Sequence, residues 1–157
     1  MSKKLVVLGW MTALCCTVCV AQENPRGPRT LLVSVPITGS PANAGVEDGS
    51  GRNPFSTIQA AVDVASPGDT VRVKKGVYRN SGFGSSENNG PVVLIKRGGD
   101  SAGGSLTLLG EPGAVIEYDG SGGILGGQGV AYVAVRNFVI KGPAGDQRVV
   151  SFTAQAG

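Results

Sequence analysis

The stretch from Asn53 to Tyr78 constrains the fold of this chain more than any other part. It begins with residues at helical spacing that form one apolar stripe: Ile58, Ala61, Val62 and Ala65. We expect a helix over Ser56–Ala65, with Ser56 as the N-cap and Gln59 completing a capping box. Pro67-Gly68 should end it, because proline cannot continue the hydrogen-bond ladder. A helix of about ten residues is marginal in water, so its stripe must pack on an apolar surface.

Short strand-like runs supply that surface. In Thr70–Lys74, Val71 and Val73 fall on one face. Other apolar runs, each bounded by turn-forming residues, are Leu31–Val35, Val92–Ile95, Leu106–Leu109, Val115–Tyr118, Tyr132–Val135, Phe138–Ile140 and Val149–Thr153. Gly76-Val77-Tyr78 is expected to be a tight glycine turn. The absence of a useful helical pattern after Ser66 argues against a βαβ sheet.

Two all-β architectures fit these runs. A β-sandwich is one, because short strands and turns alone do not distinguish it from a solenoid. The helix before the first long strand favours the solenoid, and so does the separation of 26 residues between Thr107 and Val133. That separation lies within the repeat length of roughly 20–50 residues found in such folds.

The chain resembles the entry to a right-handed parallel β-helix of the pectate-lyase-like family, in which a small helix covers the open end of the coil stack. The resemblance rests on Pro54–Ala61, Pro67–Thr70, Gly76–Arg79, Gly110–Ile116 and Asp119–Gly122. It extends over roughly Leu31–Gly142. It implies an all-β fold, a right-handed parallel β-helix (solenoid) with a short N-terminal capping α-helix. Only the cap and the first coils would be present, so the chain would be truncated relative to that family.

The first 21 residues have the pattern of a secretory signal peptide. Lys3 and Lys4 precede the apolar run Leu5–Val20, and Ala21 supplies a small residue at the expected cleavage point. The run is shorter than the roughly 20 residues that span a bilayer. We therefore expect a secreted protein with no stable membrane anchor after cleavage. Residues 22–52 would form a lead-in strand and loop, and residues 53–157 the cap and first coils.

Removing the leader changes the composition. All three cysteines lie in it (Cys15, Cys16 and Cys19), so the mature chain has no disulfide. Without Lys3 and Lys4, 12 of the 14 basic residues remain against 11 acidic ones, so we expect no nucleic-acid partner. The chain has no histidine, which excludes a Ser-His-Asp triad within it, and without His or Cys ligands it cannot build the usual zinc site.

The resemblance implies a polysaccharide partner, and most directly a lyase that acts on acidic, pectate-like glycans by β-elimination. In such an enzyme Ca²⁺ held by carboxylates neutralises the uronate, and a Lys or Arg removes a proton. Two alternatives remain open: a non-catalytic β-helix module used for binding or at a surface, and an inactive truncated remnant. Fold analogy does not choose among them. Because the central coils of the family are missing, no residue is assigned as catalytic. We expect no cofactor in this fragment, and Ca²⁺ only if the lyase interpretation holds.

Several charged residues are candidates for a binding site. Glu117 and Asp119 are two apart on one expected strand face and could begin a Ca²⁺ site, but a solvated face ending in an Asp-Gly turn is the simpler interpretation. Tyr118 between them should point inward. Asp69 and Asp48 are expected to cap turns. A basic cluster that could face an acidic glycan, but that fits an ordinary solvated strand face better, comprises Arg72, Lys74, Lys75 and Arg79. We therefore assign no metal site, and leave the substrate-binding residues unknown.

Overall fold

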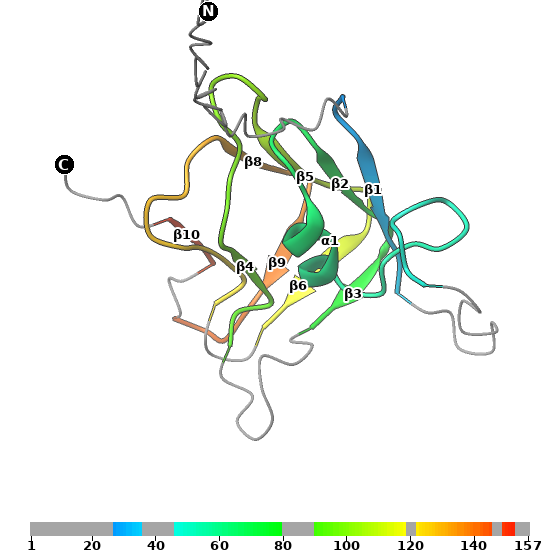
Figure 1. Cartoon of the computed structure of the whole chain (residues 1–157). Helices are drawn as coiled ribbons and strands as arrows, with labels where there is room; N and C mark the ends of the chain where they lie inside the picture. The colour runs from blue at the N-terminus through cyan, green and yellow to red at the C-terminus, as the bar shows by residue number, and fades with distance from the viewer. Residues whose placement is uncertain (1–26, 36–45, 80–89, 119–121, 146–148, 153–157) are drawn as a thin grey trace, which may run out of the picture.

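The computed structural model describes residues 27–35, 46–79, 90–118, 122–145 and 149–152 (Figure 1). The expected signal peptide, residues 1–21, and Asp119 lie outside these ranges. The described residues form one helix, α1 (Ile58–Val64), and ten strands. The strands are β1 (Thr30–Val33), β2 (Thr70–Val73), β3 (Gly76–Tyr78), β4 (Val93–Ile95), β5 (Leu106–Gly110), β6 (Ala114–Glu117), β7 (Ile124–Gly126), β8 (Val133–Arg136), β9 (Val139–Lys141) and β10 (Val150–Phe152).

The strands pair into three parallel sheets. Sheet A has the order β1-β2-β5-β8, sheet B the order β3-β6-β9, and sheet C the order β4-β7-β10. From β2 to β10 the chain visits sheets A, B and C in turn, three times over. Every strand pair is parallel, for example Thr70 with Thr107 and Thr107 with Ala134. This solenoid-like arrangement confirms the all-β expectation with parallel pairing, and it excludes the sandwich, whose sheets are antiparallel.

The core lies between the three sheets. Along β2 and β5 alternate residues are buried, as a pleated strand with one covered face requires. The largest fully buried side chains include residues from all three sheets: Val33, Val71, Val73, Val93, Ile95, Leu106, Leu108, Ile116 and Ile124. The strands of the last turn are more exposed, and none of the three residues of β10 is buried. Burial is therefore concentrated in the turns nearest the helix.

Helix α1 lies over one end of this core (Figure 1). Its packing contacts are made chiefly with β4, β1 and β2. Ile58, Ala61 and Val62 are buried, which confirms the stripe on which the sequence interpretation depended. The N-cap is Thr57, whose Oγ1 accepts from the N–H of Ala60. The prediction of Ser56 as N-cap is therefore wrong.

The capping box is also wrong, because both of its members are engaged elsewhere. The N–H of Ser56 donates to Glu47 Oε2 at 3.1 Å. The Gln59 amide bonds to the backbone of Leu94 in β4, with Oε1 accepting at 2.8 Å and Nε2 donating at 3.1 Å. The Gln59 side-chain amide thus makes the two hydrogen bonds that a neighbouring strand would otherwise make with Leu94. Gln59 also donates to Asp63 on the next turn of the helix.

Strand boundaries differ from the sequence interpretation by one or two residues, apart from two larger errors. Gly76–Tyr78, expected as a turn, is strand β3 and pairs in parallel with β6. Strand β7 was not predicted, because glycines surround its two apolar residues. No helix of the described ranges is both long and apolar enough to cross a membrane.

Candidate functional site

The candidate carboxylate Glu117 lies at the end of β6 and is ion-paired with Arg79. Arg79 Nη2 is 2.7 Å from Glu117 Oε2. Glu117 is also in register with Lys141 of β9. Tyr118 is buried, as predicted. Because its described neighbours are cations, Glu117 does not resemble one half of a Ca²⁺ site, which collects several oxygen ligands. Asp119 lies outside the described residues.

The predicted basic cluster is partly neutralised. Arg72 Nε lies 2.8 Å from Glu111 Oε1, which comes from the following turn of the solenoid. Arg79 is paired with Glu117 as described above. Exposed pairs of this kind contribute about 0–1 kcal/mol each. Lys74 and Lys75 make no ion pair with any residue that the structure describes. The positive charge of this surface therefore comes from these two lysines rather than from the arginines.

Asp69 and Asp48 both cap turns, as the sequence indicated. Asp69 is 2% exposed, and its carboxylate accepts from the N–H of Ser66 at 2.9 Å. It also accepts from the backbone N–H and the guanidinium of Arg29, both at 2.8 Å. Burial raises the pKa of Asp69, but hydrogen bonds from the Arg29 side chain and from the Ser66 and Arg29 backbones outweigh it, so its pKa lies below the ordinary value. Asp48 accepts from the N–H of Ser50.

A depression of about 460 Å³ lies where the connection after β4 meets the connection after β7. We call it the Tyr132 depression. Its lining comprises Pro67, Lys96, Arg97, Gly98, Gly99, Asp100, Ser101, Gln128, Gly129, Val130, Ala131 and Tyr132. Tyr132 is 54% exposed, although it is a large aromatic residue. Its backbone has a φ of 52°, a left-handed conformation that is rare for bulky residues.

Two glycines allow close backbone approaches beside the depression, Gly98 between the two connections and Gly99 within one of them. A Cβ at Gly98 would overlap Ala131 O, and a Cβ at Gly99 would overlap Gly104 O. The Tyr132 carbonyl accepts from Gly99 N at 3.1 Å and from Leu106 N at 2.9 Å. Tyr132, whose backbone is left-handed, is therefore also the residue whose carbonyl connects two turns of the solenoid. The depression therefore combines a hydrogen-bonded backbone with an exposed aromatic side chain.

The charged residues of the depression are held in different ways. Lys96 Nζ lies 3.7 Å from Asp63 Oδ1 of α1, and Arg97 Nη2 donates to the Asp63 carbonyl at 3.1 Å. Asp100 Oδ1 accepts from the N–H groups of Ala102 and Gly103 in its own loop. Asp100 is thus bound to its own loop backbone and both cations are bound to Asp63, and all three residues line the depression. Sequence reasoning missed these residues; the available signal was the Lys-Arg pair directly before Gly98-Gly99.

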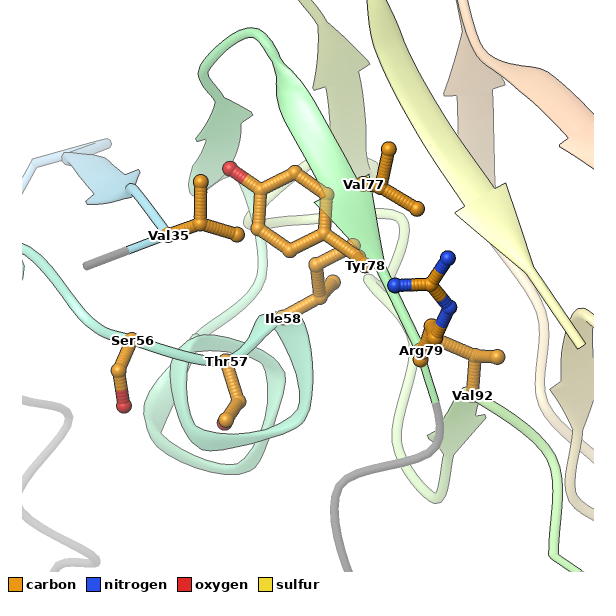
Figure 2. A pocket seen from close by; sticks show the side chains of 8 residues that line it. All are labelled: Val35, Ser56, Thr57, Ile58, Val77, Tyr78, Arg79 and Val92. Atoms are coloured by element: carbon orange, nitrogen blue, oxygen red, sulfur yellow. The ribbon is translucent and has the colours of Figure 1, made fainter. Parts of the chain in front are cut away.

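A second cavity, of about 220 Å³, lies beside the start of α1. We call it the cap pocket. Figure 2 shows the side chains around it, from the end of β1, the start of the helix, the end of β3 and the residue before β4: Val35, Ser56, Thr57, Ile58, Val77, Tyr78, Arg79 and Val92. The Tyr78 hydroxyl donates to Lys74 O at 3.0 Å. Burial raises the pKa of Tyr78, so this tyrosine is a neutral wall of the pocket.

Among the residues that the structure describes, no group of three or more His, Cys, Asp or Glu side chains is placed to hold a metal ion. Comparison with protein-family models, with curated proteins and with solved structures finds no match to this chain.

Proposed function

We propose that this chain forms the first coils of a secreted, right-handed parallel β-helix protein that binds acidic polysaccharide. Support for the β-helix comes from the repeated order of sheets A, B and C and from the helix over the first turn. Support for binding comes from the Tyr132 depression, which is open, lies between successive turns and is lined by a tyrosine, two cations and one acidic residue, Asp100, whose carboxylate is bound to its own loop.

The exposed side chain of Tyr132 carries the proposal. An exposed aromatic ring gives a flat apolar surface with one polar tip, which suits a sugar ring with one apolar face. The backbone at this position is strained, and strained residues gather at functional sites. Lys96 and Arg97 supply donors for a carboxylate, and a guanidinium can bind one through two hydrogen bonds. This combination favours a glycan that contains uronic acid.

We place binding ahead of cleavage. β-Elimination would further require a base and cation-binding carboxylates around the same sugar. Ca²⁺ would be required only for that reaction. The described ion pair of Glu117 is with Arg79 and not with another carboxylate that could share a cation. We therefore expect that the 157-residue chain binds uronate polymers without cleaving them. The ultraviolet absorbance of unsaturated products, measured with added Ca²⁺, tests the second half of this expectation.

Replacing Tyr132 by glycine should separate binding from stability. Glycine adopts a positive φ at little cost, so the free energy of unfolding should stay constant or rise by about 1 kcal/mol. Affinity for galacturonate and alginate oligosaccharides, measured by calorimetry, should fall at least about tenfold, which is 1.4 kcal/mol. Tyr132→Phe, which keeps the ring, should bind nearly as well as the original chain.

Two further measurements test the charges. Arg97→Gln should weaken binding of the uronates, and added salt should do the same, since exposed charge interactions are screened. A neutral cello-oligosaccharide should show neither dependence. If Tyr132→Gly binds uronates as tightly as the original chain, the Tyr132 depression is not the binding site.

A further inference from the structure

The charged side chains at the Tyr132 depression balance one another. Lys96, Arg97 and Asp100 line it, and Asp63 of α1 contacts both cations from outside the lining. These four residues carry two positive and two negative formal charges, which sum to zero. Which anions the depression favours therefore depends on how each cation is bound, and not on an excess of positive charge.

The two cations differ in what they contact. Lys96 Nζ lies 3.7 Å from the carboxylate oxygen Oδ1 of Asp63, and both side chains are about half exposed. Arg97 Nη2 instead donates to the backbone carbonyl of Asp63 at 3.1 Å, and Arg97 makes no ion pair with any residue that the structure describes. That bond uses one of the five N–H groups of a guanidinium and brings no negative charge to it. Arg97 is therefore the stronger position for an anion.

The carboxylate of Asp63 is held beside the depression by a side chain that also binds β4. Gln59 Nε2 donates to Asp63 Oδ1 at 2.9 Å and to Leu94 O at 3.1 Å, and Gln59 Oε1 accepts from Leu94 N at 2.8 Å. Strand β4 ends at the residue before Lys96, so this amide connects the carboxylate to the segment that carries both cations. An anion that approached Lys96 would meet a negative charge already in place there.

We infer that Asp63 makes the depression selective for glycans with one carboxylate per sugar over glycans that also carry sulfate. The carboxylate binds at Arg97. A sulfate on the same sugar would come close to Asp63 or Asp100, and like charges repel. Selectivity of this kind comes from a group that disfavours the wrong ligand. The ligand class is thus an unsulfated uronate, and this inference rests on the proposed binding of uronates at the Tyr132 depression.

Two ligands with the same backbone test the selectivity. The probes are an oligogalacturonate and its O-sulfated derivative, each titrated by calorimetry into the full chain at one ionic strength. The original chain should bind the unmodified oligosaccharide about fivefold more tightly, which is the upper range for interactions between exposed charges. A surface that attracted anions through an excess of positive charge would show the opposite order, because the sulfated ligand carries more charge.

Asp63→Asn is the matched change in the protein. Asparagine keeps a side-chain oxygen for Gln59 and the backbone carbonyl that binds Arg97, but it removes one negative charge. The sulfated oligosaccharide should then bind about fivefold more tightly, and the unmodified one should change by less than about twofold. Adding Lys96→Gln restores the charge balance, so the double variant should return towards the original preference.

Asp48→Asn is the control for this change. It removes the same charge from an exposed turn that does not line the depression, so it should leave the ratio of the two affinities unchanged. Circular dichroism checks that each variant is folded. If Asp63→Asn does not fold, the comparison of the two ligands on the original chain still decides the question.

The outcomes separate this inference from the proposed function. If the original chain binds neither oligosaccharide, uronate binding is wrong and the inference is wrong with it. If the chain binds the unmodified oligosaccharide but binds the sulfated one equally or more tightly, uronate binding stands and the inference alone is overturned. An affinity ratio that Asp63→Asn changes no more than Asp48→Asn does would also overturn it.

Discussion

At the scale of single residues, Asp69 connects three segments that are distant along the chain. Its carboxylate binds Arg29, which precedes β1, and Ser66, which follows α1, while Asp69 itself immediately precedes β2. Its own N–H donates to Ser66 O at 3.0 Å, closing the Pro67-Gly68 turn. The sequence predicted this turn cap from the local pattern. It did not predict the pair with Arg29, because nothing local marks two residues that meet only when β1 pairs with β2.

Asp69→Asn should therefore lower the free energy of unfolding by about 1–3 kcal/mol at neutral pH, since it removes charged hydrogen bonds from a buried site. The folded-state pKa is depressed, so the original stabilisation is present above the unfolded pKa of about 3.9 and is lost as the pH falls through the lower folded pKa. The asparagine variant should lose less stability across that acid range. Denaturant titrations at several pH values measure both effects.

Asp48→Asn is the control for this change. Asp48 also caps a turn, but it is exposed. Its replacement should leave the unfolding midpoint nearly unchanged. Equal effects of the two substitutions would mean that burial and the Arg29 pair are not what stabilises the Asp69 turn.

At the scale of elements, helix α1 depends on the face that it buries. Val62 is 5% exposed and Val64 is 50% exposed, although they are two residues apart in the same helix. Val62→Asp should destabilise the protein by about 3 kcal/mol or more, because it buries a charge without a partner. Val64→Asp should change the free energy of unfolding by less than about 1 kcal/mol. Thermal or urea unfolding followed by circular dichroism compares the two variants.

Similar losses in both variants would contradict the docking of this helix. A loss in Val62→Asp alone would agree with it. A comparable result is expected for Ile58→Asp, whose side chain is 2% exposed.

The helix also marks the limit of local reasoning. Its existence and its apolar face follow from the spacing of Ile58, Ala61 and Val62, and both are observed. The predicted N-cap, Ser56, lies one residue before the observed N-cap, Thr57, because the spacing of Ser56 and Gln59 matches a capping box. In the structure that amide binds Leu94, which is 35 residues away along the chain. The local sequence around a polar helix residue does not indicate that its side chain will bind the edge of a strand far along the chain.

At the scale of the whole molecule, protection should decrease along the solenoid. Strand β5 has neighbours on both sides and alternating burial, whereas the residues of β9 and β10 are mostly exposed. Solenoids are stabilised by interactions between neighbouring repeats, so their parts can open separately. Native-state hydrogen exchange should be slowest in β2 and β5 and fastest in β10. Uniform protection across all three turns would indicate a single cooperative unit instead.

The overall arrangement was more predictable than the candidate site. Alternation in Thr70–Val73 and the apolar runs near Leu106 and Val115 are local signals of strands, and the structure contains those strands. The Tyr132 depression has no such signal. It exists because Gly98 lies against Ala131, a contact between two turns of the solenoid that depends on the register of whole sheets.

The connections between sheet A and sheet B determine where this chain can be lengthened. The links are Lys74-Lys75, Glu111–Gly113 and Asn137-Phe138, and all of them are short. Gly113 and Asn137 have positive φ values there, of 91° and 60°, and a Cβ at Gly110 would approach Asn137 O to 2.5 Å. One added residue at such a corner would turn the inward side chains of the next strand outward. Insertions, epitope tags and natural length variation belong at the other two corners of each turn, where the connections are longer.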